Sequence, residues 1–343
     1  MRVQDRTTTL VELTRTGGAL NDVATKATLR NAGLDAVRIV GITAVVVGHS
    51  WNVDEVGRWV YPWHVPLFFF LTGYLFKSSR PFVVELRART RSLAYPYVFW
   101  ILTLGLLYAI SLARAARLDP DSAEMVLWGG SVAYRPFTTF WFFSVLFFTS
   151  LLARVVWRLP RLLRWACAII GITLGFLFGD QLAATPLSIG SALPCLFFIV
   201  AGAELRAVRP LLIRAAWWGT TCLILAATLI GLGVAPAMNV KGGDYGTPLS
   251  ALLALVTCAG LVLLGEALFT RVSPRFSRAV TALAVPGLIV VLLHPVVLWV
   301  LDVPDVASAW QFAAVLVLPW TAGLVAVRGR FPQFVTGIAS VRS

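Results

Sequence analysis

The three histidines of this 343-residue chain, His49, His64 and His294, all lie in or at the edge of apolar stretches long enough to cross a membrane. An ionisable ring is costly in hydrocarbon, so a histidine there usually faces the protein interior or a watery cavity and marks a functional site. A neutral imidazole can take a proton from a hydroxyl group, which is general-base catalysis. The histidines are therefore the first candidates for a catalytic site.

Arg38 precedes His49 by eleven residues and shares a predicted helix with it. Eleven residues of α-helix turn to within about 20° of the starting direction and rise by about 16 Å, so the two side chains lie on one face. Asp35 can pair with Arg38, three residues later. This stripe predicts that Arg38 binds an anionic group near one membrane surface, while His49, kept neutral by desolvation, acts as a general base. The structural alternative is a snorkelling arginine and a histidine that only hydrogen-bonds inside the bundle.

The other two histidines stand beside prolines. His64 enters a run of aromatic residues two positions before Pro66, and His294 directly precedes Pro295. A proline inside a helix frees a backbone carbonyl. Each of these histidines therefore has two interpretations: a catalytic or acceptor-binding group, or a structural group that hydrogen-bonds at a helix break.

The elements that position these residues are predicted from composition. Hydrophobic residues make up 58% of the chain, charged residues 13%, and the mean hydropathy is +0.81, whereas soluble domains carry about 25% charged residues. The apolar runs are continuous and about twenty residues long, as in transmembrane helices, and they do not alternate in the manner of β-barrel strands. The chain is therefore predicted to be an all-α, polytopic transmembrane helix bundle.

Ten membrane spans are predicted, and the basic residues orient them. The spans are residues 34–51, 59–77, 93–112, 139–157, 164–179, 187–205, 211–234, 248–269, 281–301 and 308–327. With a cytosolic N-terminus, 23 of the 29 basic residues lie in or beside cytosolic segments, the side that basic residues favour. Those assigned to the outside are Arg58, Arg114, Arg117, Arg135 and Lys241. Both termini are therefore predicted to be cytosolic, with tails at 1–31 and 331–343 and a transmembrane domain at 32–330.

The net charge of +13 does not indicate a nucleic-acid partner, because the basic residues gather on one side of the predicted membrane. There they face anionic lipid headgroups. A high arginine content with much alanine, valine and leucine indicates a bacterial protein of the inner or plasma membrane. The four cysteines form no CxxC pair and the scattered histidines lack the spacing of a metal site, so neither a metal nor a permanently bound cofactor is predicted.

Two motifs in the first two predicted spans resemble those of a known family. The first consists of Leu34, Asp35, Arg38, Gly48 and His49, and the second of His64, Pro66, Leu67, Phe68, Phe69, Phe70, Leu71, Gly73, Tyr74 and Leu75, with Thr72 in place of a usual serine. These motifs resemble the membrane-bound acyltransferase-3 family and, within it, the fucose 4-O-acetylase-like branch. Later segments extend the resemblance to roughly residues 34 to 300; they are 91–97, 141–146, 193–198 with Gly202, and 293–295.

The resemblance implies an integral membrane O-acyltransferase that moves an acyl group, expected to be acetyl, from acyl-CoA to a hydroxyl group of a carbohydrate or glycosylated metabolite. It implies that His49 removes the proton from that hydroxyl and that Asp35 and His64 complete the catalytic group. Trp141 and His294 are expected to contact the acceptor. A covalent acyl-histidine relay stays open as an alternative, and the sequence does not identify the group that would stabilise the oxyanion.

In such an enzyme, arginines at the cytosolic face are expected to hold the donor. Coenzyme A carries several phosphate groups, and guanidinium groups bind phosphate in a bidentate manner. Arg38 is one expected ligand. The family often shows Arg-x-x-Arg before the third span, whereas this chain has Arg87, Arg89 and Arg91. A spacing of four places Arg87 and Arg91 on one helix face, so the three arginines are expected to bind phosphate, and which of them takes the family role stays open.

Two other classes of protein compete with the enzyme. A transporter or flippase of a lipid-linked or sugar substrate would show inverted repeats with matched broken helices, and none is evident in the sequence. A non-catalytic membrane scaffold would leave the intramembrane histidines and Arg38 without a role. His49 lies toward the outer end of the first predicted span, which favours an acceptor on the extracytoplasmic side.

Overall fold

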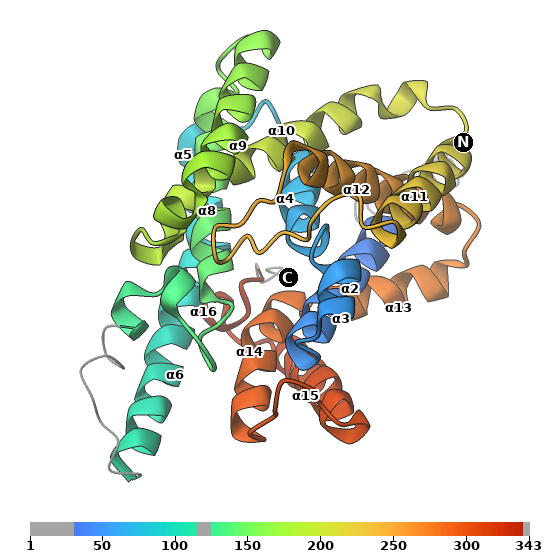
Figure 1. The fold of residues 1–343 in the computed structure, drawn as a ribbon. Coiled ribbons are helices and arrows are strands. Elements are labelled where there is room, and N and C mark those ends of the chain that lie inside the picture. Colours follow the sequence, from blue (N-terminus) through green and yellow to red (C-terminus); the bar gives the residue numbers. More distant parts are fainter. Residues whose placement is uncertain (1–30, 115–124, 339–343) are drawn as a thin grey trace, which may run out of the picture.

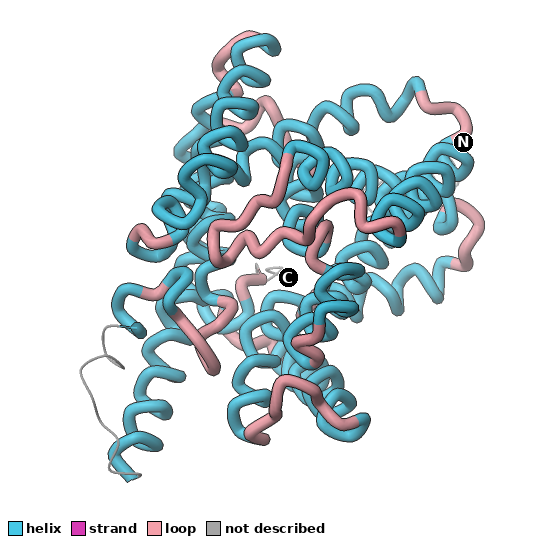
Figure 2. Tube along the Cα trace, in the orientation of Figure 1, coloured by secondary structure: helices cyan, strands magenta, loops and turns pink. Residues whose placement is uncertain are grey.

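The computed structural model describes residues 31–114 and 125–338, and within these ranges it is helical (Figures 1 and 2). The predicted all-α class is confirmed: the described residues form no strand, and their only β pairing is two isolated bridges, Trp51 with Val306 and Asn239 with Asp244. The predicted N-terminal tail lies outside the described residues except for Asn31. Residues 339–343 of the predicted C-terminal tail lie outside them as well.

The helices of the described chain follow one another in numerical order. Their bounds are α2 (Ala32–Ser50), α3 (Asp54–Val60), α4 (His64–Tyr74), α5 (Phe82–Arg89), α6 (Tyr95–Arg114), α8 (Phe140–Val156), α9 (Arg161–Ala183), α10 (Ala192–Val208), α11 (Ala215–Gly231), α12 (Pro248–Phe269), α13 (Pro274–Ala284), α14 (Gly287–Val300), α15 (Ala309–Arg328) and α16 (Gln333–Thr336). A π-helical turn, η1 (Thr90–Ala94), joins α5 to α6.

Six helical stretches of the described chain are long and apolar enough to cross a membrane. They are Ala32–Ser50, Phe82–Arg114, Arg161–Ala183, Pro186–Leu211, Pro248–Phe269 and Ala309–Arg328. A seventh results if α13 and α14, which meet at a bend of 50°, form one broken span. By length and composition, the described residues thus hold six or seven such spans, fewer than the ten predicted.

Each of the ten predicted spans nevertheless overlaps a helix, and the difference lies in helix length. α8 and α11 have 17 residues each and α4 has 11. Eleven residues rise only about 17 Å, against a hydrocarbon core of about 30 Å. The span predicted at 59–77 consists of two short helices, α3 and α4, because the chain turns between them. The count of ten and the cytosolic position of both ends stay predictions.

α4 lies at the centre of the bundle (Figure 1) and packs on α10. Glycines bring the two backbones together. A Cβ added at Gly73 would lie 1.9 Å from the carbonyl oxygen of Ile199, and one added at Gly202 would lie 2.0 Å from that of Phe70. Small residues at such crossings are typical of packed membrane helices. The crossing fixes α4, whose first residue is His64, against the rest of the bundle.

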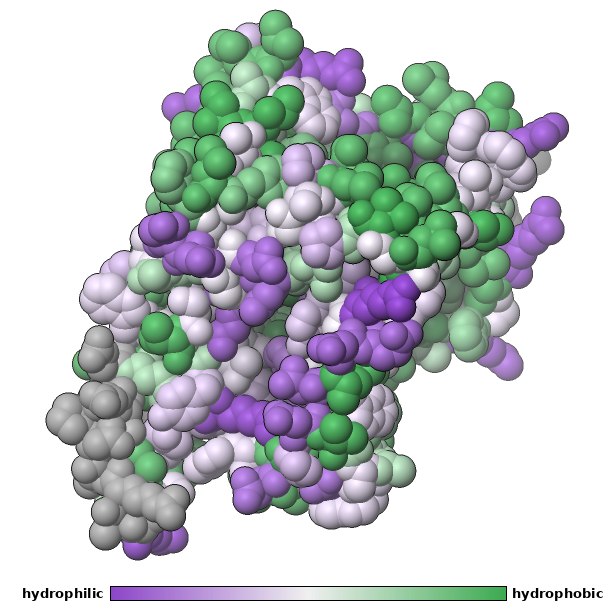
Figure 3. Space-filling view, viewed as in Figure 1, coloured by the Kyte–Doolittle hydropathy of each residue, from purple (hydrophilic) through white to green (hydrophobic). Residues whose placement is uncertain are grey.

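The surface divides by polarity (Figure 3). Hydrophobic side chains cover the outer helices α6, α9 and α11, where Leu102, Leu162 and Ile224 are more than half exposed. Large exposed apolar surfaces mark contact with a membrane or another protein. Hydrophilic side chains gather across the middle of the face shown in Figure 3. The outer helices therefore carry an apolar surface suited to contact with lipid. The polar side chains of this face lie near its middle, where Figure 2 shows loops.

Candidate active site

α2 carries both residues of the predicted stripe. Its N-cap is Asn31, a favoured residue for that position, whose side-chain oxygen accepts two backbone N–H groups of the first turn at 3.0 and 3.2 Å. Arg38 then donates to the buried carboxylate of Asp35 at 2.5 Å, the ion pair that a spacing of three predicts. His49 lies in the last turn, about 16 Å from Arg38 along the axis. Asp35 is further still from His49, at about 21 Å, so its observed contact is with Arg38 and not with the histidine.

Groups from three other segments hold the C-terminal end of α2. The last carbonyls of a helix have no partner within it. The carbonyl of Gly48 accepts from the hydroxyl of Tyr61 at 3.2 Å. The carbonyl of His49 accepts from the guanidinium of Arg135 at 3.1 Å, and the carbonyl of the next residue accepts from a backbone N–H of the loop after α14 at 2.9 Å. The turn that bears His49 is therefore fixed from three directions.

His49 and His294 form a hydrogen-bonded pair. His49 Nδ1 lies 2.8 Å from His294 Nε2, and the rings stack with centroids 5.0 Å apart. His294 Nδ1 lies 3.1 Å from the carbonyl oxygen of Val290; a carbonyl only accepts, so this nitrogen carries hydrogen. In a neutral His294, Nε2 is then an acceptor, and His49 Nδ1 donates to it. This assignment leaves Nε2 of a neutral His49 with a lone pair, the form that a general base needs.

His64 is oriented by the same kind of bond. Its Nδ1 donates to the carbonyl of Val60 at 3.0 Å, which leaves Nε2 as the acceptor of the neutral ring. The ring lies beside that of Tyr61, with centroids 5.1 Å apart. The three histidines, which the sequence scatters over three segments, are thus brought together: His49 and His64 line one cavity, and His294 bonds His49.

A threonine satisfies the backbone carbonyl that Pro295 leaves without a partner inside α14. Proline lacks the N–H that would bond the carbonyl of Val291, four residues earlier. The hydroxyl of Thr139, the N-cap of α8, donates to that carbonyl at 2.8 Å. The acceptor freed by the proline is therefore satisfied from another helix, and His294 keeps its Nε2 for His49.

Three neighbouring cavities meet around α2. The large cavity holds about 470 Å³ and is bordered by Arg38. The histidine cavity holds about 40 Å³ between His49, His64 and Trp141. The Arg135 cavity holds about 150 Å³ and is bordered by His49 as well. His49 therefore stands between the histidine cavity and the Arg135 cavity.

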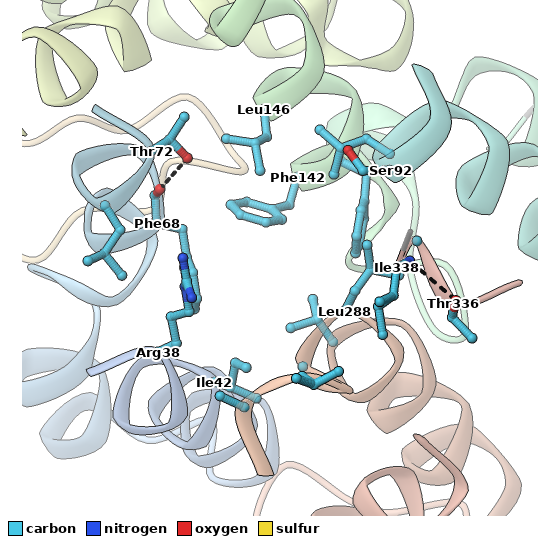
Figure 4. Close-up of a pocket in the computed structure, with 18 of the residues that line it drawn as sticks. Arg38, Ile42, Phe68, Thr72, Ser92, Phe142, Leu146, Leu288, Thr336 and Ile338 are labelled. Atoms are coloured by element: carbon cyan, nitrogen blue, oxygen red, sulfur yellow. Dashed lines mark hydrogen bonds between the residues drawn. The ribbon is translucent and has the colours of Figure 1, made fainter. Parts of the chain in front are cut away.

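The large cavity and the histidine cavity share part of their walls. Phe68, Phe142 and Val291 line both, and the two phenylalanine rings meet edge to face with centroids 5.5 Å apart. Figure 4 shows Arg38 and Phe68 along one side of the large cavity, with Phe142 facing them across it. A chain of spaces thus follows α2 from Arg38 toward His49 and narrows at the phenylalanines.

Two cations from the loops lie on the other side of His49. Arg135 bonds the His49 carbonyl, and burial lowers the pKa of its guanidinium while the nearby carboxylate of Asp305 opposes that shift. Lys241 donates to the backbone carbonyl two residues before Arg135, and burial lowers the pKa of its amine to about 8. Positive charge at the C-terminal end of a helix interacts favourably with the helix dipole. The bond from Arg135 thereby stabilises the end of α2.

A family model for an acyltransferase domain, Acyl_transf_3, matches residues 31–328. The chain belongs to the acyltransferase-3 family. Neither a curated protein nor a solved structure matches it. Family membership and the apolar helices together identify a membrane acyltransferase. This agrees with the reaction class that the first two motifs predict, and it speaks against the transporter and scaffold alternatives.

Three arginines closely precede α6 in the acyltransferase, and one of them lines the large cavity. That residue is Arg89, which lines the cavity together with Arg38 and also donates to the buried carboxylate of Glu85 at 2.7 Å. Arg87 and Arg91 are exposed and do not line the cavity. The α-helical spacing that was expected to join Arg87 to Arg91 is interrupted by the π-helical turn η1, which changes the register between them.

The described part of the predicted C-terminal tail also borders the large cavity. The indole N–H of Trp100 on α6 donates to the carbonyl of Val335 in α16 at 2.9 Å. Thr336 and Ile338 line the cavity and lie across it from Arg38 in Figure 4. This described part of the predicted tail is therefore packed against the helix bundle of the acyltransferase.

Trp141 is a wall of the histidine cavity and is nearly fully buried. The sequence alone left it between an interfacial anchor and an acceptor contact. No group of three His, Cys, Asp or Glu side chains in the described ranges is arranged to hold a metal ion. In the described chain, the polar groups that line the histidine cavity and the Arg135 cavity are imidazoles, hydroxyls, an indole, the guanidinium of Arg135, the amide of Asn52 and the carboxylate of Asp305.

Sequence reasoning missed three residues that hold or flank His49: Tyr61, Arg135 and Lys241. A signal was present for the two cations. Both belong to the few basic residues assigned to the outside, where the positive-inside rule disfavours them. A cation kept there against that bias indicates a local role, and in this acyltransferase that role lies at the end of α2.

Proposed function

We propose that this membrane acyltransferase is an O-acetyltransferase that moves the acetyl group of acetyl-CoA to a hydroxyl group of a carbohydrate or glycosylated metabolite. The observation that carries the proposal is the position of His49. It borders the Arg135 cavity on one side and the histidine cavity on the other, and the histidine cavity shares its walls with the large cavity that contains two arginines. A group in this position can contact both a donor and an acceptor.

The large cavity suits coenzyme A. Its volume of about 470 Å³ lies in the usual range for ligand pockets, about 300–1,000 Å³. Arg38 and Arg89 supply guanidinium groups for phosphate, and most other lining residues are apolar, as a pantetheine arm requires. The distance of about 16 Å between Arg38 and His49 along α2 is comparable to the length of an extended pantetheine arm.

The histidine cavity favours a short acyl group. Its volume of about 40 Å³ is small beside the 470 Å³ of the large cavity. Phe68, Phe142 and Trp141 close it with aromatic rings. An acetyl group fits a space of this size, whereas each further methylene of a longer chain would have to displace a ring. This argument supports acetyl-CoA over longer acyl-CoA donors.

His49 supplies the proton transfer. The acceptor hydroxyl gives its proton to Nε2 of His49 while its oxygen attacks the thioester carbonyl. The new C–O bond forms and the C–S bond breaks, so that the acetyl group moves to the acceptor. The proton then passes from His49 to the departing thiolate of coenzyme A. Throughout this cycle His294 accepts the hydrogen bond from His49 Nδ1 and keeps the ring in its reactive tautomer.

The acceptor enters from the Arg135 cavity. The arginine distribution favours an extracytoplasmic position for the C-terminal end of α2, an orientation in which a cytosolic donor and an outer acceptor meet at His49. The resemblance to the fucose 4-O-acetylase-like branch supports a sugar hydroxyl as the acceptor. We place the enzyme in a bacterial inner or plasma membrane, where its cytosolic arginines face anionic lipid headgroups.

Purified protein in nanodiscs with acetyl-labelled acetyl-CoA and a mixture of glycosides tests the proposal. We expect label on a glycoside with the wild-type protein. His49→Gln, which keeps size and polarity but removes the base, should lower transfer by about 100-fold or more. The stabilisation of the protein by coenzyme A should persist in that variant. Full transfer by His49→Gln, or wild-type protein that neither transfers nor hydrolyses the acetyl group, would overturn the proposal.

A further inference from the structure

A fourth cavity, here called the Trp51 cavity, opens beside the Arg135 cavity and has no part in the transfer step. Its volume is about 420 Å³. One wall is the segment from Trp51 to Asp54 with α3, and the other is the loop that follows α11. Asn52 and Tyr61 line both this cavity and the Arg135 cavity. A molecule with one end beside His49 can therefore extend past these two residues into the Trp51 cavity.

The aromatic walls of the Trp51 cavity are held in place. The indole N–H of Trp51 donates to the carbonyl of Ala307 at 2.8 Å, and its ring stacks on Phe312 with centroids 4.3 Å apart. The hydroxyl of Tyr61 is engaged with the end of α2. These rings keep their orientation without a ligand, so a bound molecule does not have to pay the entropy of ordering them.

The polar groups of the cavity carry both signs. The carboxylate of Asp54 and the guanidinium of Arg58 line it together with the amide of Asn52. Arg58 is itself held by Glu55 and by carbonyls at the end of α11. Opposite charges so close together favour neither a strongly anionic nor a strongly cationic ligand. They do offer both donors and acceptors of hydrogen bonds.

A pyranose ring has the complementary chemistry. Its C–H face packs against tryptophan or tyrosine, and its hydroxyl groups both donate and accept around the edge. Rigid aromatic side chains give large contact areas of this kind at low entropic cost. We propose that the Trp51 cavity binds a second sugar ring of the acceptor, so that the enzyme acts on neutral disaccharides or longer glycans in preference to monosaccharides. This inference rests on the proposed O-acetyltransferase function.

The experiment compares methyl glycosides of glucose, galactose and mannose with methyl disaccharides that carry the same ring at the non-reducing end. Acetyl transfer from acetyl-CoA is measured as kcat/KM for each acceptor. We expect at least one disaccharide to exceed its monosaccharide by about tenfold or more, the range for one added group in a specific pocket. Ala237→Phe, on the loop wall, fills the cavity and should bring that ratio to about one.

Val234→Phe is the matched control. Val234 lies on the same loop, is 45% exposed and does not line the Trp51 cavity, so the disaccharide preference should persist. Equal values for monosaccharides and disaccharides, or the same loss of preference in both variants, would overturn the inference. So would hydrolysis of acetyl-CoA that depends on His49 without acetylation of any disaccharide. The absence of both transfer and hydrolysis would instead count against the proposed function itself.

Discussion

His49 donates a hydrogen bond to His294 across 2.8 Å, although 245 residues separate the two in the sequence. His294 is fully buried and is tied in turn to a backbone carbonyl of its own helix. The direction of both bonds follows from that carbonyl, which only accepts. The pair therefore determines which nitrogen of His49 is available for catalysis.

We predict that His294→Ala lowers kcat for acetyl transfer by about 100-fold, within the range for loss of a general base's orientation. The KM for acetyl-CoA should change less than about twofold, because His294 does not line the large cavity. His294→Gln, whose side-chain oxygen can accept from His49, should recover part of the activity. A Gln variant no better than Ala at equal thermal stability would argue against a positioning role.

Arg38 and Arg89 should govern the affinity for the donor. We predict that Arg38→Ala and Arg89→Ala each raise the KM for acetyl-CoA by about tenfold or more, which corresponds to about 1.4 kcal/mol of lost binding free energy. Arg87→Ala and Arg91→Ala are the matched controls, since both side chains are exposed outside the large cavity. The increase in melting temperature on addition of coenzyme A is a second measure of the affinity for the donor. An equal effect of all four variants would mean that general charge, not the cavity, attracts the donor.

The bond between Thr139 and the carbonyl freed by Pro295 should be measurable as stability. Thr139→Val keeps the shape but leaves that buried carbonyl without its donor, which should cost about 1–3 kcal/mol. In the double variant with Pro295→Ala, the new backbone N–H can bond Val291 within the helix, so the loss should shrink. The free energies of unfolding of the two single variants and the double variant give the coupling energy between Thr139 and Pro295. Additive losses would show that the hydroxyl does not substitute for the missing N–H.

The C-terminal segment should affect donor binding. Gly337 has φ of +70°, and a Cβ there would lie 2.8 Å from both the carbonyl oxygen of Ser92 and a methyl group of Leu288. We predict that Gly337→Val displaces this wall of the large cavity and raises the KM for acetyl-CoA several-fold while leaving the KM for the acceptor unchanged. Gly105→Ala, where an added Cβ meets only an ordinary contact at 3.7 Å, is the control. Unchanged donor kinetics in Gly337→Val would exclude the segment from the donor site.

Lys241 gives a prediction about pH. Burial lowers the pKa of its amine to about 8, against 10.4 for an exposed lysine, so between these values the unfolded chain binds more protons than the folded one. Stability therefore rises with pH across that window. Lys241→Met should melt higher than the wild type at pH 7, and the difference should shrink at pH 9.5, where the wild-type amine is neutral in the fold. A constant difference across this range would contradict the buried, shifted amine.

Local features of the site follow from the sequence. The Asp35–Arg38 pair and the carbonyl that Pro295 leaves without its N–H partner are consequences of spacing within one helix, and the structure has both. The predicted span 34–51 also agrees with α2 (Ala32–Ser50) to within two residues at each end. The two motifs of the opening spans also indicated the acyltransferase-3 family. Periodicity and proline chemistry act over a few residues, so a single sequence contains them.

Other features depend on contacts between distant segments. The pairing of His49 with His294 and the capping of α2 by Arg135 join residues far apart in the chain, and no spacing rule predicts them. The π-helical turn η1, which separates the environment of Arg89 from that of Arg91, leaves no signal in hydrophobic periodicity. The same holds for the C-terminal segment, whose contact with Trp100 joins residues 235 positions apart.

The edge-to-face contact of Phe68 with Phe142 bears on the permeability of the membrane. In the proposed reaction a two-carbon unit passes from one aqueous compartment toward another, yet the histidine cavity that adjoins these rings holds only about 40 Å³. A closure of this kind lets an acyl group through on its carrier while it excludes hydrated ions. Phe142→Ala would remove one ring of this contact and join the histidine cavity more widely to the large cavity, so we expect it to weaken the separation of the two spaces.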